Sequence, residues 1–153
     1  MRIEPMNHAY AMEYINWKYM PPYEFYNIPP GGVEETLEEI FGTSGMDYYS
    51  VLDEDGTLFG MYMYSFCDGT MNIGLGIRPA SCGQGNGNDF VGTCISFGRE
   101  KYAYTGVIRL MAADFNLRAI HLYRSVGFAE TGRIDKLSYG TPVTFVLMES
   151  EKV

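Results

Sequence analysis

The chain has 153 residues, of which 46% are hydrophobic, and a formal net charge of −8 at pH 7. This length fits one domain with a single core, so we expect one domain over residues 1–153. The acidic balance argues against a nucleic-acid surface, which normally needs a basic patch, and mildly favours a cationic small molecule or a basic peptide as partner. The sequence has no apolar run long enough for a membrane span and no signal-peptide pattern at its start. We therefore expect a cytoplasmic protein that does not bind membranes.

Cysteine and histidine are scarce. The chain has three cysteines and two histidines, with no Cys-x-x-Cys pair. An odd number of cysteines without regular spacing is typical of reduced thiols in a cytosolic protein rather than of a disulfide framework. Since zinc sites are built mostly from these two residue types, we expect no metal site.

The first part of the chain predicts a strand, two helices and an irregular segment between the helices. A short strand is expected over residues 2–6, and a helix over 8–20 that ends because the residue before Pro21 is pushed out of the helical region. Residues 23–32 are too rich in proline and glycine for a regular element. A second helix is expected over 33–41, with its apolar residues turned inward, namely Val33, Leu37, Ile40 and Phe41.

The rest of the chain predicts strands and helices in alternation. An Asp-Gly pair at residues 55–56 is typical of a hairpin turn. Strands are expected at residues 48–52 and 58–66, from 70 until Pro79 ends the strand, at 107–112, from 127 and over 141–148. Helices are expected to end at 102 and to span 116–126. The predicted order is β-α-α-β-β-β-α-β-α-β-β, an α/β (α+β) domain with a central mixed, mostly antiparallel sheet flanked by helices.

A glycine-rich turn follows the strand that begins at residue 70. Gly83, Gly85 and Gly87 stand at every second position, and a helical pattern begins at Phe90. A strand, a glycine turn and a helix in this order place unpaired backbone N–H groups and the positive end of a helix dipole around an anion, so we expect a phosphate or pyrophosphate here. The spacing is not that of a dinucleotide-binding motif, because Asn88 stands where the third glycine is needed, nor that of a P-loop.

Two stretches resemble the GNAT superfamily, the acetyl-coenzyme A-dependent N-acetyltransferases. Residues 77–87, Ile-Arg-Pro-Ala-Ser-Cys-Gly-Gln-Gly-Asn-Gly, are similar to the family's strand-end proline and Arg/Gln-Gly-x-Gly-x-Gly loop. Residues 116–128 resemble its Asn-x-x-Ala-x-x-x-Tyr-x-x-x-Gly-Phe stretch and are followed by Gly132. Both motifs occur in the family's order, and the resemblance in element order covers nearly the whole chain.

The resemblance implies a GNAT-like fold and a set of residues that bind acetyl-coenzyme A. Backbone amides of the loop would hold the pyrophosphate, and the strand before it would bind the pantetheine arm. The implied residues are Leu75, Gly76 and Ile77 in the strand and Cys82, Gly83, Gln84, Gly85, Asn86 and Gly87 in the loop. Cys82 departs from the family, which often has Arg or Gln there, and Asn86 stands where an apolar residue is common.

Two residues of the second motif have both a structural and a functional interpretation. Asn116 caps the following helix, contacts the coenzyme, or does both. Tyr123 is either a core residue or, as the resemblance implies, the general acid that protonates the departing thiolate. An ordinary phenol has a pKa near ~10 and can donate a proton at neutral pH.

The acceptor side is less defined than the coenzyme side. An aromatic segment after the first expected helix, with Tyr23, Glu24, Phe25 and Tyr26, would line the pocket for an amine, as GNAT proteins usually place it there. Asn72 lies on the strand where the resemblance would place a carboxylate base, but asparagine is not a base. Glu24 is a candidate base, with an ordinary solvated loop residue as the simpler interpretation.

The sequence therefore predicts an N-acetyltransferase that moves the acetyl group of acetyl-coenzyme A to a primary amine of a small molecule or peptide by direct attack. A non-catalytic module that binds acyl-coenzyme A is the alternative, since position 72 lacks a carboxylate. A thiol enzyme using Cys82 is a weaker alternative. The acceptor and the oligomeric state stay open, with a homodimer among the alternatives.

Overall fold

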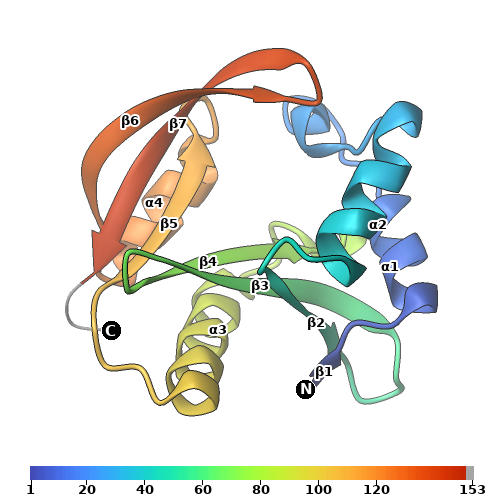
Figure 1. The fold of residues 1–153 in the computed structure, drawn as a ribbon, viewed down its shortest axis with the longest axis horizontal. Coiled ribbons are helices and arrows are strands. Elements are labelled where there is room, and N and C mark those ends of the chain that lie inside the picture. The colour runs from blue at the N-terminus through green and yellow to red at the C-terminus, as the bar shows by residue number, and fades with distance from the viewer. Residues whose placement is uncertain (151–153) are drawn as a thin grey trace. The chain divides into compact units, whose positions relative to one another are not determined.

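The computed structural model describes residues 1–150. Leaving aside three short 3₁₀ helices (Glu24–Tyr26, Pro30–Gly32 and Pro79–Ser81), its elements follow the predicted order β-α-α-β-β-β-α-β-α-β-β (Figure 1). Hydrogen bonds connect seven strands in the order β1-β2-β3-β4-β5-β7-β6. The predicted α/β class with a mixed sheet and flanking helices is confirmed. The structure has two compact units: unit 1 holds residues 1–65 and 75–82, and unit 2 holds residues 66–74 and those from Gly83 onward.

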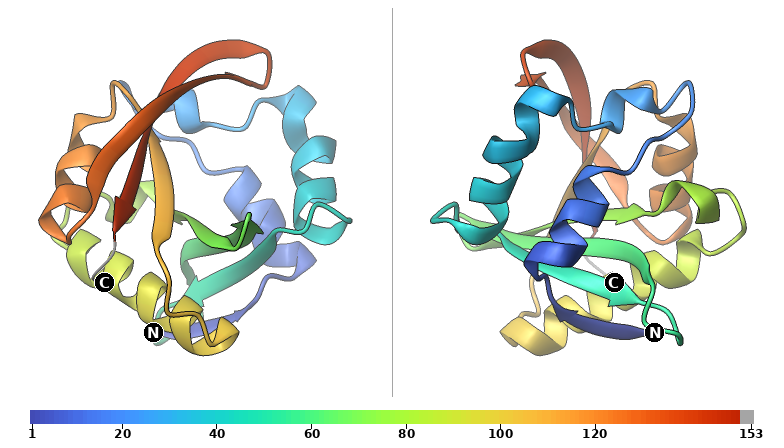
Figure 2. Two further views of the ribbon diagram at one scale, coloured as in Figure 1. Left: turned by 60° about the vertical axis from the view of Figure 1, so that its left-hand side comes forward. Right: turned by 90° about the vertical axis from the view of Figure 1, so that its right-hand side faces the viewer.

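Unit 1 is built from an antiparallel set of strands with two helices. Its strands are β1 (Arg2–Pro5), β2 (Asp47–Leu52), most of β3 (Leu58–Cys67) and the end of β4 (Thr70–Ile77), and its helices are α1 (His8–Ile15) and α2 (Val33–Phe41). β2 pairs antiparallel with both β1 and β3. Helix α1 covers one face of these strands (Figure 2). Their shared core contains Met6, Ala11, Trp17, Leu52, Leu58 and Met61.

Two details of the unit 1 helices differ from the sequence prediction. Helix α1 ends at Ile15 and not at residue 20, because the Asn16 side chain donates a hydrogen bond to the Met12 carbonyl at 2.8 Å and closes the last turn. In α2 the most buried side chain is Thr36, which is 2% exposed and donates to a backbone carbonyl. Phe41 was expected to face inward but is 48% exposed, so that prediction was wrong.

Unit 2 combines the other strands with the two longer C-terminal helices. It contains β5 (Ile108–Ala113), β6 (Ala129–Ser138), β7 (Thr141–Ser150), α3 (Gly87–Tyr102) and α4 (Leu117–Ser125), together with the first part of β4. β7 pairs antiparallel with β5 on one side and with β6 on the other (Figure 1). β4 pairs with β5 in parallel. Among residues 1–150, none of the helices has the length and apolar character that a membrane span requires.

Candidate functional site

The glycine loop, residues Gly83–Gly87, lies in unit 2 and needs glycine for two different reasons. Gly83 and Gly85 have φ of +73° and +80°, a backbone conformation that other residues rarely adopt. Gly87 has an ordinary φ, but a Cβ there would lie 2.8 Å from Cδ2 of Leu122 on α4. The first two glycines therefore shape the turn, and the third lets α3 and α4 pack closely.

Helix α3 begins directly after this turn, at Gly87. Asn86 occupies the N-cap position in a helical conformation, and its side chain makes no capping hydrogen bond. The turn thus meets a helix N-terminus, which attracts anions through its N–H groups and dipole. Asp89 in the first turn adds a negative charge, which opposes a bound anion.

Arg118 on α4 is a residue that the sequence interpretation missed. Its Nη1 nitrogen lies 3.7 Å from the point that a Cβ at Gly83 would occupy, so the guanidinium lies against the glycine loop. The position two residues after Asn116, in the first turn of the helix, was the signal that could have identified it. Arg118 supplies a positive charge beside a loop that Asp89 makes partly negative.

Asn116 has the capping role. Its Oδ1 accepts a hydrogen bond from the Ala119 amide at 3.2 Å, which confirms it as the N-cap of α4. The Asn116 amide in turn donates to the Ala113 carbonyl at 2.9 Å, so the end of β5 is joined directly to the start of α4. Its predicted contact with a coenzyme stays a prediction.

Tyr123 lies on α4 with its ring in the interior of unit 2. It is 8% exposed and makes an edge-to-face contact with Phe128, with ring centroids 6.2 Å apart. The backbone of Phe128 also donates to the Tyr123 carbonyl at 3.0 Å, as the chain leaves the helix through Gly127 at φ +109°. The ring is therefore held in one place, as a precise proton donor requires.

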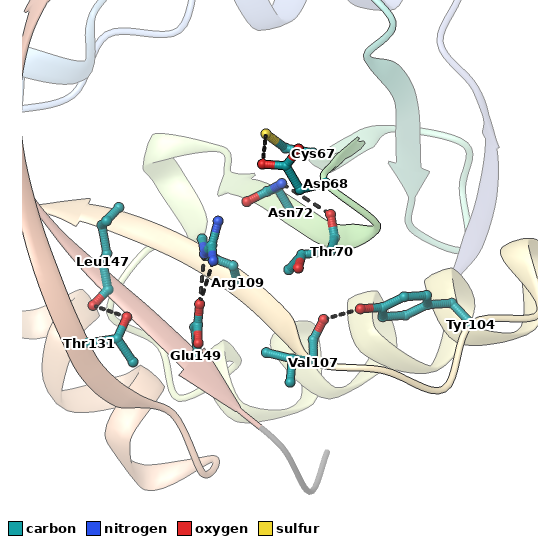
Figure 3. Close-up of polar contacts among 10 residues, drawn as sticks. All are labelled: Cys67, Asp68, Thr70, Asn72, Tyr104, Val107, Arg109, Thr131, Leu147 and Glu149. Carbon is teal, nitrogen blue, oxygen red and sulfur yellow. Dashed lines mark hydrogen bonds and ion pairs between the residues drawn. The ribbon is translucent and has the colours of Figure 1, made fainter.

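Asn72 marks the place where β4 and β5 stop pairing. The parallel ladder consists of Met71 with Ile108 and Asn72 with Arg109. Figure 3 shows Asn72 beside Arg109, with the Asn72 amide donating to the Thr70 carbonyl at 3.3 Å. Arg109 bonds Oε2 of Glu149 on β7 through Nη2 at 2.7 Å and Nε at 2.8 Å.

The end of β4, which belongs to unit 1, directs the backbone N–H and C=O groups of successive residues alternately toward β3 and away from it. The Arg78 amide donates to the Phe59 carbonyl on β3 at 2.9 Å. Because adjacent residues of a strand direct their backbone groups to opposite sides, Gly76 also points toward β3, whereas Leu75 and Ile77 point away from it. Of the three predicted positions, Leu75 and Ile77 therefore direct their backbone groups to the side of β4 away from β3, where the Ile77 carbonyl accepts hydrogen bonds from Tyr19 and Cys82.

Tyr19 is a second residue that the sequence interpretation missed. Its hydroxyl donates to the Ile77 carbonyl at 2.8 Å and would lie 3.7 Å from a Cβ placed at Gly76. Its backbone amide donates to Oδ1 of Asn27 at 2.6 Å, and the Asn27 side chain donates back to the Tyr19 carbonyl at 3.3 Å. Tyr19 therefore connects the end of β4 to the base of the segment Tyr19–Asn27, which we call the aromatic loop.

The aromatic loop contains the four predicted acceptor-side residues. Tyr23, Phe25 and Tyr26 are half-buried, and the Phe25 and Tyr26 rings meet edge to face with centroids 5.2 Å apart. Glu24 is exposed, as expected of an ordinary loop carboxylate. All four residues lie in unit 1, whereas Asn72 lies in unit 2.

Cys82 is the last residue of the second segment of unit 1. Its thiol lies 3.4 Å from the Ile77 carbonyl and 3.5 Å from the Arg78 carbonyl, and it donates to these backbone oxygens. His8, the histidine of unit 1, stacks with Phe41. The two carbonyl contacts give Cys82 a role in shaping the turn.

Arg78 fixes the turn that leads to Cys82. Its Nε donates to Oγ of Ser81 at 2.7 Å, and its Nη1 lies 3.3 Å from Oδ2 of Asp53. The guanidinium also lies over the Phe59 ring, 5.4 Å from its centroid. The pKa of Asp53 is lowered from its ordinary value, first by a side-chain hydrogen bond with Asp55, with the Thr57 amide and the Arg78 charge adding to the effect and desolvation opposing it.

One measurable hollow lies elsewhere in unit 1. It has a volume of about 250 Å³ and includes none of the predicted site residues; it is lined by Pro5, Met6, Ile40, Met46, Asp47, Tyr48 and Tyr49. Within residues 1–150, no three His, Cys, Asp or Glu side chains are grouped so that they could hold a metal ion. Apart from Asn72 and Cys82, the site residues predicted from the sequence lie in the glycine loop, at the start of or within α4, at the end of β4 and in the aromatic loop.

Comparison with known proteins identifies the family. The model of the acetyltransferase (GNAT) family matches residues 9–128, which include the glycine loop, all of α4 and Phe128. The chain therefore belongs to the GNAT family and is an acyltransferase. None of the curated proteins matches its sequence.

Solved structures share the fold at low sequence identity. A spermidine N-acetyltransferase SpeG chimera from Vibrio cholerae and hSSAT has a TM-score of 0.75 at 18% identity, covering 98% of this chain and 95% of its own. A putative phosphinothricin N-acetyltransferase has a TM-score of 0.75 at 16% identity, covering 98% and 97%. SpeG from Vibrio cholerae in complex with manganese ions has a TM-score of 0.70 at 18% identity, covering 97% and 90%. This likeness confirms the fold.

Proposed function

We propose that the chain transfers the acetyl group of acetyl-coenzyme A to a primary amine of a small molecule or peptide, by direct attack of the amine on the thioester. The observation that carries this proposal is the glycine loop. Gly83 and Gly85 turn the backbone with positive φ into the uncapped start of α3, in a chain that belongs to the GNAT family. Such a turn offers N–H groups and a partial positive charge to a pyrophosphate.

The charges around the loop support a phosphate-bearing ligand. Asp89 disfavours an anion at the helix start, and the guanidinium of Arg118 against Gly83 favours one. A guanidinium is always charged and binds phosphate well, so Arg118 more than offsets Asp89 when a phosphate group is bound. Arg118 would also replace the side-chain contact that Cys82 cannot provide.

The end of β4 would bind the pantetheine arm through its backbone. The Ile77 carbonyl already accepts a hydrogen bond from Tyr19, which leaves the Ile77 amide and the backbone groups of Leu75 for the ligand. Backbone groups of a strand with no neighbouring strand can pair with an extended amide chain as a further strand would. Gly76 contributes mainly by its missing side chain.

Tyr123 would donate the proton that the departing thiolate needs. Its ring is fixed against Phe128, so a phenolic proton can be delivered from a constant position. The amine must lose its own proton to a base or to water before or during attack. Glu24 is exposed and is the carboxylate that we propose to test for this role; without a base, positioning alone would have to supply much of the rate.

A cationic amine is the acceptor class that we favour. The net charge of −8 attracts cations, and aromatic rings such as Tyr23, Phe25 and Tyr26 bind ammonium groups through their faces. Of the two SpeG structures above, the chimera is named as a spermidine N-acetyltransferase and the other as a spermidine/spermine N-acetyltransferase, so polyamines are the first amines that we would test. Amino sugars, amino acids and peptide N-termini follow.

Release of free coenzyme A thiol from acetyl-coenzyme A tests the proposal. The assay would use spermidine, an amino sugar, a free amino acid and a short peptide as separate acceptors, with the acetylated product checked by mass spectrometry. We expect amine-dependent thiol release with at least one acceptor. Tight binding of acetyl-coenzyme A without thiol release for any amine would favour the non-catalytic binding module instead.

A further inference from the structure

Asn72, Arg109 and Glu149 form one row across three strands of unit 2. Asn72 on β4 pairs opposite Arg109 on β5, and Arg109 pairs opposite Glu149 on β7. Residues directly opposite each other on neighbouring strands place their side chains on the same face of the sheet. All three residues are half-buried, whereas the residues before and after them on β4 and β5 are buried, namely Met71, Ile73, Ile108 and Leu110. The row therefore lies on the face of the sheet that is turned away from the core of unit 2.

The row lies at the point where β4 and β5 separate. The pair of Asn72 with Arg109 is the last of the parallel ladder, and among the described residues no later residue of β4 pairs with β5. The proposed function, on which this inference rests, assigns the pyrophosphate to the glycine loop that follows β4 and the pantetheine arm to β4 itself. The arm would run back along β4 from this loop, so its acetyl end would lie toward Asn72.

The side-chain amide of Asn72 is held by its nitrogen. Nδ2 donates to the Thr70 carbonyl at 3.3 Å, which directs Oδ1 away from that carbonyl. Within residues 1–150, no group donates a hydrogen bond to Oδ1, and Figure 3 shows the amide beside Arg109. An amide oxygen has two lone pairs that accept hydrogen bonds. Asn72 therefore offers an acceptor at the end of the ladder.

Arg109 keeps a positive charge next to Asn72. Its Nε and Nη2 both bond the same oxygen, Oε2 of Glu149, at 2.8 and 2.7 Å. Glu149 lies one strand farther from Asn72, so the positive end of this ion pair is the nearer one. A positive charge near a basic nitrogen disfavours the protonated form of that nitrogen. The position beside Asn72 therefore favours a neutral amine over an ammonium group.

The turn before β4 carries the other ionisable groups near this end of the sheet. The Cys67 thiol lies 3.9 Å from Oδ2 of Asp68 and donates to it (Figure 3). Asp68 is exposed, so water and salt weaken its effect on the row. Helices α3 and α4 lie on the other face of these strands (Figures 1 and 2). The charges that face Asn72 are therefore those of Arg109 and, one strand farther away, Glu149.

We propose that Asn72 binds the attacking nitrogen of the acceptor as a neutral amine, with Oδ1 accepting one N–H of that amine. An amide oxygen accepts a hydrogen bond but takes no proton, so the amine has already lost its proton to water when it binds. Its lone pair forms the C–N bond as the C–S bond of the thioester breaks. The thiolate takes a proton from Tyr123, and the new amide releases its extra proton to water. Other amino groups of the acceptor can stay protonated.

This role explains why position 72 has no carboxylate. A carboxylate beside Arg109 would attract the ammonium form of the acceptor and compete with Glu149 for the guanidinium, whereas asparagine leaves the ion pair intact. Binding of the neutral form also makes the pKa of the acceptor a determinant of specificity. Alkyl amines titrate near ~10.4, as lysine does, and peptide α-amino groups near ~7.7–8.0, so a larger fraction of the peptide amine is neutral at pH 7.

The pH dependence of kcat/KM for the acceptor tests the inference, with spermidine and a short lysine-free peptide with a free N-terminus as the two amines. For an enzyme that takes the neutral amine, kcat/KM follows the neutral fraction. From pH 7 to pH 9 we expect a rise of about 100-fold for spermidine and of less than about tenfold for the peptide. An enzyme that binds the ammonium form and removes its proton would give a nearly constant kcat/KM for both. Either amine alone suffices, because the rising and the constant profile differ for each.

Two variants of Asn72 separate binding of the amine from a structural role. Asn72→Ala should lower kcat/KM for both amines about fivefold, because one hydrogen bond is lost, and should leave its pH dependence unchanged. Asn72→Asp supplies a carboxylate that attracts the ammonium form, so the rise for spermidine should shrink to less than about tenfold. Lys136→Gln, on the exposed strand β6, makes the same change in net charge and should keep the native profile. Thermal unfolding and the KM for acetyl-coenzyme A show whether each variant keeps its fold and coenzyme site.

Three outcomes would overturn the inference: a constant kcat/KM between pH 7 and pH 9 in the native chain, an Asn72→Ala variant with native kcat/KM, or an Asn72→Asp variant with the native pH profile. Amine-dependent thiol release would persist in each of these cases, so the proposed function would stand. Absence of thiol release with every amine would overturn the proposed function, and this inference with it.

Discussion

The glycine loop of unit 2 takes its shape from the backbone, whereas the aromatic loop of unit 1 takes its shape from side-chain hydrogen bonds. Gly83 and Gly85 are required by positive φ, and Gly87 by close helix packing. In the aromatic loop, Asn27 holds both backbone groups of Tyr19. Backbone requirements admit few residue types, so they are visible in the sequence. Hydrogen bonds from a side chain to the backbone, such as those of Asn27, can be made by several residue types and can differ between enzymes with different substrates.

This difference predicts that changes beside the glycine loop act on acetyl-coenzyme A, and changes in the aromatic loop act on the acceptor. Replacement of Tyr123 is expected to change the binding of neither acetyl-coenzyme A nor the acceptor amine. Tyr123→Phe should lower kcat by about 100-fold, the range of a general acid, because the proton donor for the thiolate is lost. Steady-state kinetics with both substrates varied would measure this.

The matched control for Tyr123 is Phe128→Leu, which changes the packing of the same ring without removing a proton donor. We expect a small loss of stability and a kcat within a few-fold of the native value. If Tyr123→Phe keeps full turnover, the assignment of Tyr123 as general acid is wrong.

Arg118→Ala should have the next largest effect. Loss of a charged contact to a phosphate group should raise the Kd for acetyl-coenzyme A by about tenfold, and the difference should shrink as salt is added. Isothermal titration calorimetry at two salt concentrations would measure both effects. Arg124→Ala, at the other end of α4, is the control and should bind normally; equal losses in the two variants would point to a general charge effect.

Asn27→Ala should affect the acceptor alone. The variant loses the hydrogen bonds that hold the Tyr19 backbone at the base of the aromatic loop. We expect the KM for the amine to rise about fivefold, which corresponds to one ordinary hydrogen bond of about 1 kcal/mol. The KM for acetyl-coenzyme A should stay unchanged.

Glu24→Gln tests a different role in the same loop. A strong fall in kcat would identify Glu24 as the base, and an unchanged kcat would identify it as a solvated loop residue.

Asn116→Ala should have the smallest effect. Loss of an N-cap lowers the free energy of unfolding by about 1 kcal/mol, which corresponds to a fall in Tm of about 3 °C for a chain of this size. Asn116→Asp keeps the acceptor oxygen and should restore most of the stability. A fall in acetyl-coenzyme A affinity in both variants, beyond the change in stability, would add the coenzyme contact that the family resemblance implies.

The element order and the glycine loop could be predicted from the sequence because both follow from local rules. Alternating apolar residues predicted the strands, and the spacing of the glycines predicted the turn. The end of α1 was predicted five residues too late, since the Asn16 side chain closes the helix before Pro21 can act. Tyr19 was missed because its role depends on a contact with Ile77, far away in the sequence, which spacing does not encode. Arg118 was missed although its position in the first turn after Asn116 was a usable signal, because its approach to Gly83 is known only from the structure.

The acceptor half of the site could be predicted only in outline. The aromatic segment could be recognised in the sequence. Its hydrogen bond between the Tyr19 amide and Asn27 could not, because the sequence does not show that residues 19 and 27 are in contact. Asn72 was recognised as a departure from a carboxylate, and the ion pair of Arg109 with Glu149 beside it was not. Cross-strand partners of this kind become known only once the register of β4, β5 and β7 is fixed.

Thermal unfolding with and without acetyl-coenzyme A, for the native chain and for Gly85→Val and Gly85→Asn, tests the central claim most directly. At about 100 times its Kd, acetyl-coenzyme A should stabilise the native chain by about 2.7 kcal/mol. The shift should be lost in Gly85→Val, because a β-branched residue resists φ of +80°, and largely kept in Gly85→Asn, because asparagine tolerates it. A native chain that acetyl-coenzyme A does not stabilise, or a Gly85→Val variant stabilised as much as the native chain, would contradict the glycine loop as the coenzyme site.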